Sequence, residues 1–410
     1  MNIQDIIEVL PFENLKKMFP PKMSFVLRLT SKQINTVLKN IKVDTIVVTK
    51  KDIKITEDKI NKLNLWCNVI KLYLNNCTFE EKVLEKALCK NTALVKLNLK
   101  TNVLKNDVIL SILHALNVNT VLASLKINCN EIRETEGIAI ASILCVNKTL
   151  VKLSLKNNFL KDNVIYVIAD VLCNNKTLTS LNLENNHIRE LGARAIAYTL
   201  TVNSSLKKLN FKNNLLGELG VREIMDALFH NTILTELNIS SNYIGKDGGQ
   251  IIAPALRINT TLVKLDISDN HLNDIGIYEI SKALHTNTTL TTLNLSHNMY
   301  IYERNINIET IIETLCMNNM LKVLDLAYNN LQNQGGFAIA KALNVNTILV
   351  ELNLQGNKLK ETGVCEIIEV LQENKTLKTL NLSKNRISED LINTIKNVQY
   401  NTRLTTLILN

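Results

Sequence analysis

The residues that could catalyse a reaction or hold a metal ion are scattered along this chain of 410 residues. His187 and His271 share one position of a repeated pattern but lie three copies apart, too far to share a metal ion. The sequence has no P-loop, no Gly-x-Ser-x-Gly, no His-Glu-x-x-His and no glycine-rich dinucleotide turn. We therefore expect no catalytic residue, no metal site and no cofactor, which predicts a protein that is not an enzyme.

The elements that must position the other side chains follow a repeated pattern, L-x-x-L-x-L-x-x-N-x-L. From Leu94 the first leucine of this pattern returns every 28 residues, with a single interval of 31. The L-x-L core alternates with period two, as in a short strand with one buried face, and the rest of each copy has the apolar spacing of a helix. Residues 69–79 form a degenerate earlier copy, residues 43–48 a weaker one and residues 404–409 a truncated last one. The first leucines are Leu94, Leu122, Leu150, Leu178, Leu206, Leu234, Leu262, Leu290, Leu321, Leu349 and Leu377.

The pattern resembles the leucine-rich repeat, and its 28-residue length with a full helix is similar to the ribonuclease-inhibitor-like class, which also occurs in NOD-like receptors. The resemblance covers residues 69–410. It implies an α/β leucine-rich-repeat solenoid with parallel strands on a concave face and helices on a convex face. Because parallel strands stack about 4.8 Å apart and helices about 8–10 Å apart, a row of such units must curve into a horseshoe.

Two series of asparagines recur in register with the leucines. The first series follows each strand where the chain turns away, so we expect its amides to pair with buried backbone groups; Cys77 takes this place in the degenerate copy. The second series stands three residues before each first leucine, where the helix must end, and we expect it in the left-handed conformation. The first series is Asn102, Asn130, Asn158, Asn186, Asn214, Asn242, Asn270, Asn298, Asn329, Asn357 and Asn385; the second is Asn91, Asn119, Asn147, Asn175, Asn203, Asn231, Asn259, Asn287, Asn318, Asn346, Asn374 and Asn401.

The cysteines follow the repeat rather than a metal-ligand spacing. Four of them stand two residues before an asparagine of the second series, which we interpret as filling of the core. Helices of neighbouring repeats pack about 8–10 Å apart, whereas a disulfide requires Cα atoms within about 7 Å, so we expect free thiols. The four are Cys89, Cys145, Cys173 and Cys316.

Composition and the amino-terminal residues predict a folded intracellular protein. Hydrophobic residues make up 46% of the chain and charged residues 21%, which excludes wholesale disorder. The first residues lack an apolar stretch long enough for a secretory signal, and no run of about 18 apolar residues could span a bilayer. We expect a cytoplasmic or nuclear location without membrane association, and the host cytoplasm for a pathogen or viral protein.

Residues 1–40 lie outside the repeats, and residues 10–32 resemble an F-box. The resemblance rests on Leu-Pro-x-Glu-x-Leu-x-x-Met-Phe at residues 10–19, then Pro-Pro-Lys at 20–22 and Leu-Arg-Leu-Thr-Ser-Lys at 27–32. It implies short helices that bind the Skp-type adaptor of a cullin-RING ubiquitin ligase through Leu10, Pro11, Leu15 and Phe19. The alternative interpretation is a helical cap of the solenoid. We assign residues 41–68 to an N-terminal cap or degenerate repeat.

The variable positions beside and within each strand are the candidate partner contacts. In the first six copies they are mostly lysines with a single acidic residue, Glu184, whereas acidic and basic residues nearly balance in the next six. This polarity predicts a protein ligand with an acidic surface. Stacking aromatics and arginines are too few for us to expect a nucleic acid. The candidates are Lys71, Tyr73, Lys96, Lys100, Lys126, Lys152, Lys156, Lys207, Lys208, Lys212, His297 and Tyr328, and, in the three-residue insertion, Tyr300, Tyr302 and Arg304.

These observations predict non-enzymatic protein recognition by the concave face. Two interpretations stay open: an F-box-type substrate receptor of a cullin-RING ubiquitin ligase, and a plain binding scaffold or pathogen effector with no link to ubiquitin. A more distant alternative is a GTPase-activating protein of the Ran type, which has this repeat class but carries an acidic tail that this sequence lacks. The ligand's identity and the oligomeric state stay open, because a solenoid face specifies shape and charge only.

Overall fold

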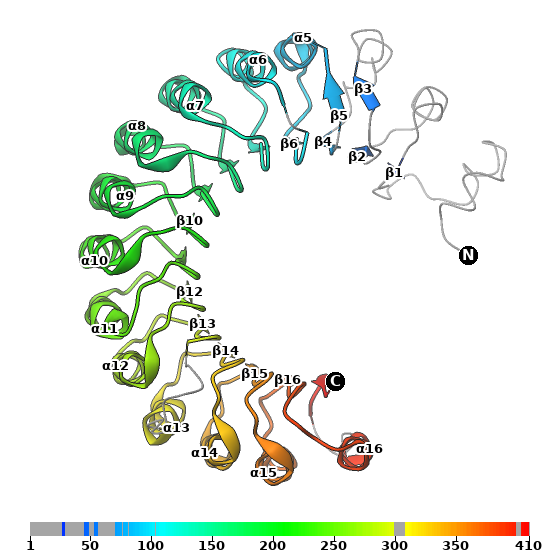
Figure 1. Ribbon diagram of the computed structural model, residues 1–410, viewed down its shortest axis with the longest axis vertical. Coiled ribbons are helices and arrows are strands. Elements are labelled where there is room, and N and C mark those ends of the chain that lie inside the picture. Colours follow the sequence, from blue (N-terminus) through cyan, green and yellow to red (C-terminus); the bar gives the residue numbers. More distant parts are fainter. Residues whose placement is uncertain are drawn as a thin grey trace, which may run out of the picture. The chain divides into compact units, whose positions relative to one another are not determined.

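The structure, a computed structural model, describes residues 27–28, 45–48, 53–55, 70–75, 77–80, 82–102, 104–298, 308–398 and 403–409. It divides into two units, Met1–Asn186 and His187–Asn410. Within each unit short strands alternate with helices, and the strands line one side while the helices line the other (Figure 1). This is the alternation that the 28-residue pattern predicts.

The first unit contains a parallel sheet ordered β1-β2-β4-β6-β7-β8-β9 and a small second sheet of β3 and β5. Its register places residues of successive copies side by side, for example Leu97 beside Leu125. The strands are β1 (Leu27–Arg28), β2 (Thr45–Val48), β3 (Ile53–Ile55), β4 (Lys71–Leu74), β5 (Cys77–Phe79), β6 (Lys96–Asn98), β7 (Ser124–Lys126), β8 (Lys152–Ser154) and β9 (Ser180–Asn182). The helices are α5 (Val83–Lys90), α6 (Asn106–Leu116), α7 (Glu134–Val146) and α8 (Lys161–Asn174).

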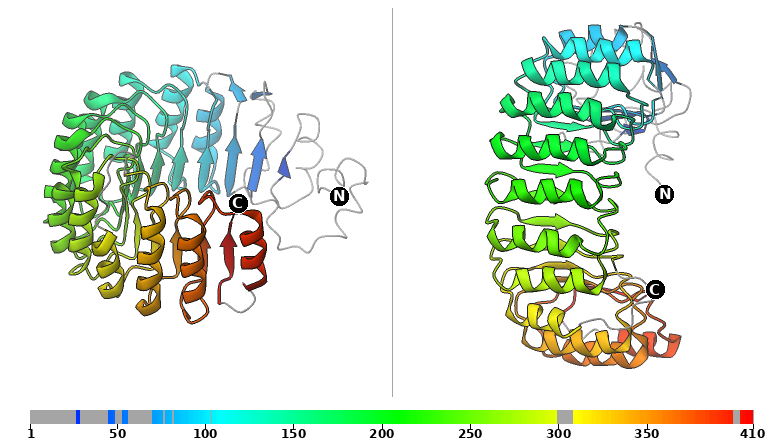
Figure 2. Two further views of the ribbon diagram at one scale, coloured as in Figure 1. Left: turned by 60° about the horizontal axis from the view of Figure 1, so that its bottom comes forward. Right: turned by 60° about the vertical axis from the view of Figure 1, so that its left-hand side comes forward.

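The second unit repeats this arrangement with parallel strands β10 to β17 in chain order. Figure 2 shows that, within each unit, the arrows of neighbouring strands point the same way. The strands are β10 (Lys208–Asn210), β11 (Glu236–Asn238), β12 (Lys264–Asp266), β13 (Thr292–Asn294), β14 (Val323–Asp325), β15 (Glu351–Asn353), β16 (Thr379–Asn381) and β17 (Thr406–Ile408). The helices are α9 (Glu190–Val202), α10 (Gly217–Leu228), α11 (Gly248–Ile258), α12 (Asn273–Leu284), α13 (Ile308–Met317), α14 (Gln332–Val345), α15 (Lys360–Val370) and α16 (Glu389–Val398).

The core of each unit lies between the strands and the helices. The central leucine of each strand from β6 to β16 is buried, as Leu237 of β11 is, while the residues on either side of it point away from the helices. Small residues permit close helix packing: a Cβ atom on Gly249 of α11 would overlap the backbone of Gly276 of α12. The period-two pattern of the strands and the helical spacing are therefore both confirmed.

The first asparagine series has the predicted role. Asn158, which is 2% exposed, donates from Nδ2 to the carbonyl oxygens of Ile127 (3.0 Å) and Leu155 (2.7 Å). Its Oδ1 accepts the N–H of Asn130 at 3.0 Å. One amide thus satisfies buried backbone groups in two neighbouring copies, which is why the position recurs.

The second asparagine series ends the helices, but the predicted left-handed conformation is wrong. Asn147 is extended, with φ −70° and ψ 126°. Its Nδ2 donates to the carbonyl oxygen of Leu116 at 2.7 Å, and its Oδ1 accepts the N–H groups of Thr149 (3.0 Å) and Leu150 (2.8 Å). The side chain, rather than a left-handed backbone, therefore satisfies the helix end. Left-handed residues occur instead just before the first series, as at Asn157 (φ 56°).

The predicted free thiols are present, but the core-filling role of four cysteines is wrong. Among the described residues no disulfide forms between the cysteines, which are Cys77, Cys89, Cys129, Cys145, Cys173, Cys316 and Cys365. Of the four that share a repeat position, Cys89, Cys145 and Cys316 are exposed and Cys173 is half-buried. The residue just before each of them, such as Leu144, fills the core, and the next residue is turned about 100° around the helix.

Several expectations for the amino-terminal segment fall outside the described residues, including Leu10, Pro11, Leu15 and Phe19. Leu27–Arg28, in the segment predicted to be helical, form the strand β1 instead. Thr45–Val48 pairs in parallel with β4, in the place of a strand one copy earlier. Among the described residues, no helix is both long enough and apolar enough to cross a membrane.

Candidate protein-binding surface

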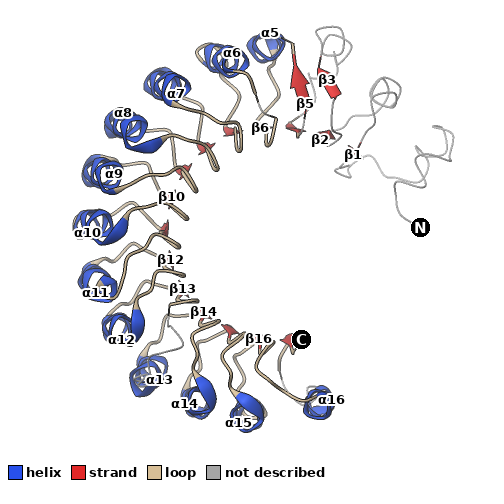
Figure 3. Cartoon of the chain, in the orientation of Figure 1, coloured by secondary structure: helices blue, strands red, loops and turns tan. Residues whose placement is uncertain are grey.

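Figure 3 shows the strands of each unit on the side opposite its helices. Because side chains alternate along a strand and the central residue is buried toward the helices, the first and third residues of each strand form the opposite face of the sheet. In the first unit the register forms two rows of such residues, which we call the strand face of the first unit. One row is Lys71, Lys96, Ser124, Lys152 and Ser180, and the other is Tyr73, Asn98, Lys126, Ser154 and Asn182.

The strand face of the first unit is strongly basic. Lys71 lies directly beside Lys96 on neighbouring strands, which are about 4.8 Å apart, and such like-charge neighbours repel. Lys96, Lys126 and Lys152 are exposed. An acidic ligand would relieve this repulsion.

Lysines also continue beyond the strand ends. Exposed Lys100 and half-buried Lys156 follow β6 and β8, each two residues after the strand. Glu184, the one acidic residue among the described candidate positions of the first unit, lies two residues after β9 and accepts a hydrogen bond from Lys156 Nζ at 2.7 Å. The structure therefore pairs one candidate lysine and leaves the exposed row uncompensated.

The second unit is electrically balanced, as the sequence predicts. Lys208 of β10 pairs with Glu236 of β11 at 2.7 Å, and Lys264 of β12 lies 3.7 Å from the same carboxylate. Of the other two candidates there, Lys207 is exposed and Lys212 is half-buried. A ligand would have to break an ion pair to use Lys208, which makes it a weaker contact than the unpaired lysines of the first unit.

The structure brings together His297 and Tyr328, which lie 31 residues apart. Their rings stack with centroids 4.3 Å apart and an interplanar angle of 22°. The Tyr328 ring extends over Gly356, where a Cβ atom would lie 2.5 Å from the ring, and its hydroxyl accepts a hydrogen bond from Lys384 Nζ at 3.0 Å. Tyrosine buries much area at little entropic cost, so this fixed ring is a suitable anchor for a protein ligand.

Two features of the loops around Tyr328 were not predicted from the sequence. Gly356, which lies under the Tyr328 ring, was not among the candidate contacts, and the hydrogen bond from Lys384 to the Tyr328 hydroxyl was not predicted. A hollow in the same loops, lined by Lys358, Lys360 and Arg386 among others, was also missed. Its signal in the sequence is a basic residue directly after two successive asparagines of the first series, Asn357 and Asn385. The candidates Tyr300, Tyr302 and Arg304 lie outside the described residues.

The described residues offer no metal site, since no three histidine, cysteine or acidic side chains gather there. His114 Nδ1 lies 2.7 Å from Glu85 Oε1, and His285 Nε2 lies 3.2 Å from Thr314 Oγ1. Each of these histidines thus has one local partner. The exposed strand face and the loops that follow it remain the surfaces with chemistry to offer.

Comparison with known proteins identifies the repeat. The leucine-rich-repeat family matches six segments, residues 174–197, 230–253, 259–281, 286–299, 318–340 and 373–390. No curated protein matches the chain. The sequence prediction of leucine-rich repeats is confirmed in these segments.

Three solved structures that match this chain have low sequence identity to it. The TLR13–ssRNA13 complex matches with 18% identity and a TM-score of 0.54, over 93% of this chain and 48% of that chain, so this chain spans about half its length. An internalin (InlF) from Listeria monocytogenes is 18% identical over 92% of this chain and 94% of that one, with a TM-score of 0.46. Leiomodin-1 actin-binding site 2 is 22% identical over 44% and 88%, with a TM-score of 0.31. The strand–helix alternation, the parallel sheets and the six matched segments together make this chain a leucine-rich-repeat solenoid.

Proposed function

We propose that the chain is a non-enzymatic recognition scaffold that binds an acidic protein surface through the strand face of the first unit. The observation that carries this proposal is that Lys71 lies beside Lys96 in one row of the strand face, while Glu184, the one acidic residue among the described candidate positions of the first unit, is already held by Lys156. Solenoid repeats provide an extended surface of this kind for ligands. A row of lysines accelerates encounter with an acidic partner and makes the association sensitive to salt.

A protein ligand is favoured over a nucleic acid. TLR13 was solved with a single-stranded RNA, so a related fold can carry this alternative. Single-stranded nucleic acids bind to grooves that combine positive charge with stacking aromatics. Among the described outward residues of β4 and β6 to β9, Tyr73 is the one aromatic side chain. Such a face has the charge but lacks the stacking platform.

The finer proposal is a substrate receptor of a cullin-RING ubiquitin ligase with repeats of the ribonuclease-inhibitor-like class. Support for the class comes from the 28-residue period with a full helix in each copy. Support for the receptor comes from the F-box-like residues, in which Leu10, Pro11, Leu15 and Phe19 would contact a Skp-type adaptor in the cytoplasm or nucleus. Without adaptor binding, the chain is a plain scaffold.

The experiment is a capture from eukaryotic cell lysate with three full-length proteins, read by mass spectrometry. The variant Lys96→Glu/Lys152→Glu reverses two unpaired lysines of the strand face. The control Lys105→Glu/Lys176→Glu makes the same change of net charge at exposed positions outside the strands. We expect partners captured by the wild type and the control to be lost by the strand-face variant, with on-rates reduced about tenfold.

The adaptor is tested separately with Leu15→Asp/Phe19→Asp in the full chain. Loss of adaptor and cullin with retention of the other partners supports the receptor. Identical partner sets for the strand-face variant and its control would refute recognition through the strand face.

A further inference from the structure

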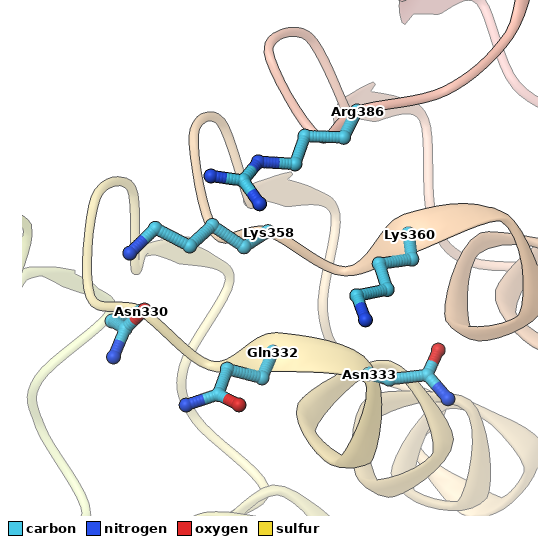
Figure 4. A pocket seen from close by; sticks show the side chains of 6 residues that line it. All are labelled: Asn330, Gln332, Asn333, Lys358, Lys360 and Arg386. Atoms are coloured by element: carbon cyan, nitrogen blue, oxygen red, sulfur yellow. The ribbon is translucent and has the colours of Figure 1, made fainter. Parts of the chain in front are cut away.

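The loops after β14, β15 and β16 of the second unit enclose a hollow of about 330 Å³. Figure 4 shows its six lining side chains, which come from successive loops and from the starts of α14 and α15. They are Asn330, Gln332, Asn333, Lys358, Lys360 and Arg386. The structure describes all six, and the hollow lies wholly within the second unit.

The backbone aims these side chains in a common direction. Asn330, Lys358 and Arg386 stand 28 residues apart, each directly after a buried asparagine of the first series. All three are left-handed, with φ of 54°, 58° and 61°. Gln332 and Lys360 form a second equivalent pair, with φ of 57° and 58°. Since equivalent residues share one backbone conformation, their side chains leave the solenoid side by side.

The three cations of the hollow lack acidic partners. Among the described residues, no carboxylate lies within 4.0 Å of Lys358, Lys360 or Arg386, whereas Lys156, Lys208 and Arg222 each have one. The nearest acidic residue in sequence, Glu361, accepts the backbone N–H of Ser388 at 3.3 Å. Three uncompensated positive charges within one small hollow repel one another and favour an anion between them.

The polar side chains of the hollow point to the same ligand. Asn330 is 7% exposed, lines the hollow, and its amide makes no hydrogen bond to another described residue. Its polar atoms are not enclosed by the protein but open into the hollow, so Nδ2 can donate to a ligand oxygen there. Asn333 Oδ1, the nearby acceptor, already accepts hydrogen bonds from Thr362 Oγ1 (2.6 Å) and the N–H of Gly363 (2.7 Å), and no hydrogen bond joins it to Lys360.

We propose that this hollow is an anion site that binds a phosphate group on a phosphorylated segment of a protein ligand. An arginine fork and two ammonium groups match the several oxygens and double charge of a phosphomonoester. Helices α14 and α15 begin at Gln332 and Lys360, and their positive ends add to the attraction.

The carrier of the phosphate is argued from the surroundings of the hollow. Its volume is at the low end of the ~300–1,000 Å³ range of ligand pockets, and none of its lining residues is aromatic, so a nucleobase finds no stacking partner. Tyr328, which stacks on His297, lies two residues before Asn330 and offers a flat surface to a peptide beside the phosphate. The choice of a peptide carrier rests on the proposed function, but anion binding here does not depend on the lysines of the first unit.

The test compares full-length wild type, Lys358→Gln/Arg386→Gln and the control Lys246→Gln/Lys341→Gln, which removes two exposed charges elsewhere in the second unit. Each protein is immobilised and incubated with a random-sequence peptide library carrying a central phosphoserine, and with the same library unphosphorylated. We expect the wild type and the control to retain the phosphorylated library at least tenfold better, and the hollow variant to lose this preference. Inorganic phosphate should compete in the wild type.

Three results would overturn the proposal: equal retention of both libraries by the wild type, an equal loss in the control, or displacement of the peptides by a single-stranded oligonucleotide that itself requires Lys358 and Arg386. The lysate capture with strand-face variants reports on the first unit separately. A negative result with the peptide libraries would therefore leave the proposed function unaffected, and a negative result in the lysate capture would leave anion binding in the hollow unaffected.

Discussion

Two buried asparagines of the first series, Asn242 and Asn270, should respond differently to the same substitution. Both are 0% exposed and occupy equivalent positions in neighbouring copies of the second unit. In the variant Asn270→Ala, the N–H of Asn242 loses its acceptor at 2.8 Å and the carbonyl of Ile239 loses its donor at 2.9 Å. No other hydrogen bond to either group joins described residues, so both are left buried and unpaired.

The variant Asn242→Ala leaves no such group behind. The carbonyl of Phe211 keeps a hydrogen bond from Asn214 Nδ2 at 2.7 Å, and the carbonyl of Ser240 keeps one from the N–H of Asn213 at 2.9 Å. The Oδ1 atom of Asn242 itself has no partner among the described residues. Both variants open a cavity of the same size and lose amide hydrogen bonds, so these contributions nearly cancel in the comparison.

The difference between the two variants follows from the two orphaned groups. A buried unsatisfied backbone group costs about 1–3 kcal/mol, so Asn270→Ala should reduce the free energy of unfolding by about 2–6 kcal/mol more than Asn242→Ala. Urea denaturation measures the total, and hydrogen exchange measures local opening, since long repeat arrays do not unfold in one step. A difference of about 2.8 kcal/mol appears as a roughly 100-fold loss of protection in the loop after β11.

The exposed helical residue Asn344 supplies the control. Its replacement by alanine removes the same atoms from the surface of α14 and should change stability by less than about 0.5 kcal/mol. Equal losses for Asn270→Ala and Asn242→Ala would refute the reasoning, because the asparagines would then stabilise the solenoid by filling space rather than by pairing with specific backbone groups.

Two further predictions concern packing and thiol chemistry. Gly249→Ala should lower the free energy of unfolding by about 2–3 kcal/mol, because its Cβ would overlap the backbone of Gly276. Gly217 has open space around it and a φ of +61°, so Gly217→Ala should lower the free energy of unfolding by only about 1 kcal/mol. The opposite order of the two losses in urea denaturation would contradict the close approach of α11 and α12. Burial raises the pKa of the Cys77 thiol to about 11, so iodoacetamide at about pH 8.5 should modify exposed Cys145 well before Cys77, as measured by mass spectrometry. Alkylation of Cys77 faster than that of Cys145 would refute the burial of Cys77. Because the Cys77 thiol ionises at a lower pH in the unfolded chain than in the folded chain, the stability due to its burial is present below about pH 8.5 and decreases as the pH rises toward 11.

The regular part of the fold could be predicted because it is repeated. Alternation around Leu237 predicts a strand, and eleven aligned copies make the assignment of strands and helices secure. The conformation of Asn147 could not be obtained this way. Its amide donates to Leu116, in the copy before, and that contact depends on how two copies stack. An argument from residue propensity considers Asn147 only within its own segment. It therefore predicts a left-handed backbone, whereas in the structure the side chain makes the hydrogen bonds that end the helix.

The candidate sites show the same difference between features set within one copy and features that depend on how several copies stack. The lysines of the strand face were predicted because position within the repeat decides which side chains leave the sheet. The support of Tyr328 was not predicted, since it needs the missing side chain at Gly356 and a lysine two copies away. The hollow likewise depends on three loops at once, and its charge becomes visible only when Lys358 and Arg386 are placed in neighbouring copies.

The recurrent asparagines also explain how the loops of the second unit hold Tyr328 and the side chains of the proposed phosphate site in place. A left-handed backbone costs a residue other than glycine about 1–2 kcal/mol, yet Tyr328 and Asn330 adopt it on either side of Asn329. Asn329 is 0% exposed and fixes this turn with hydrogen bonds to the carbonyls of Leu295 (3.0 Å) and Leu326 (3.1 Å). The turn geometry is thus set by the asparagine and not by its neighbours, so the flanking side chains are free to vary while the backbone holds them in place. Aromatic and cationic residues at these flanking positions are therefore preorganised for binding, which is the condition under which few contacts give useful affinity.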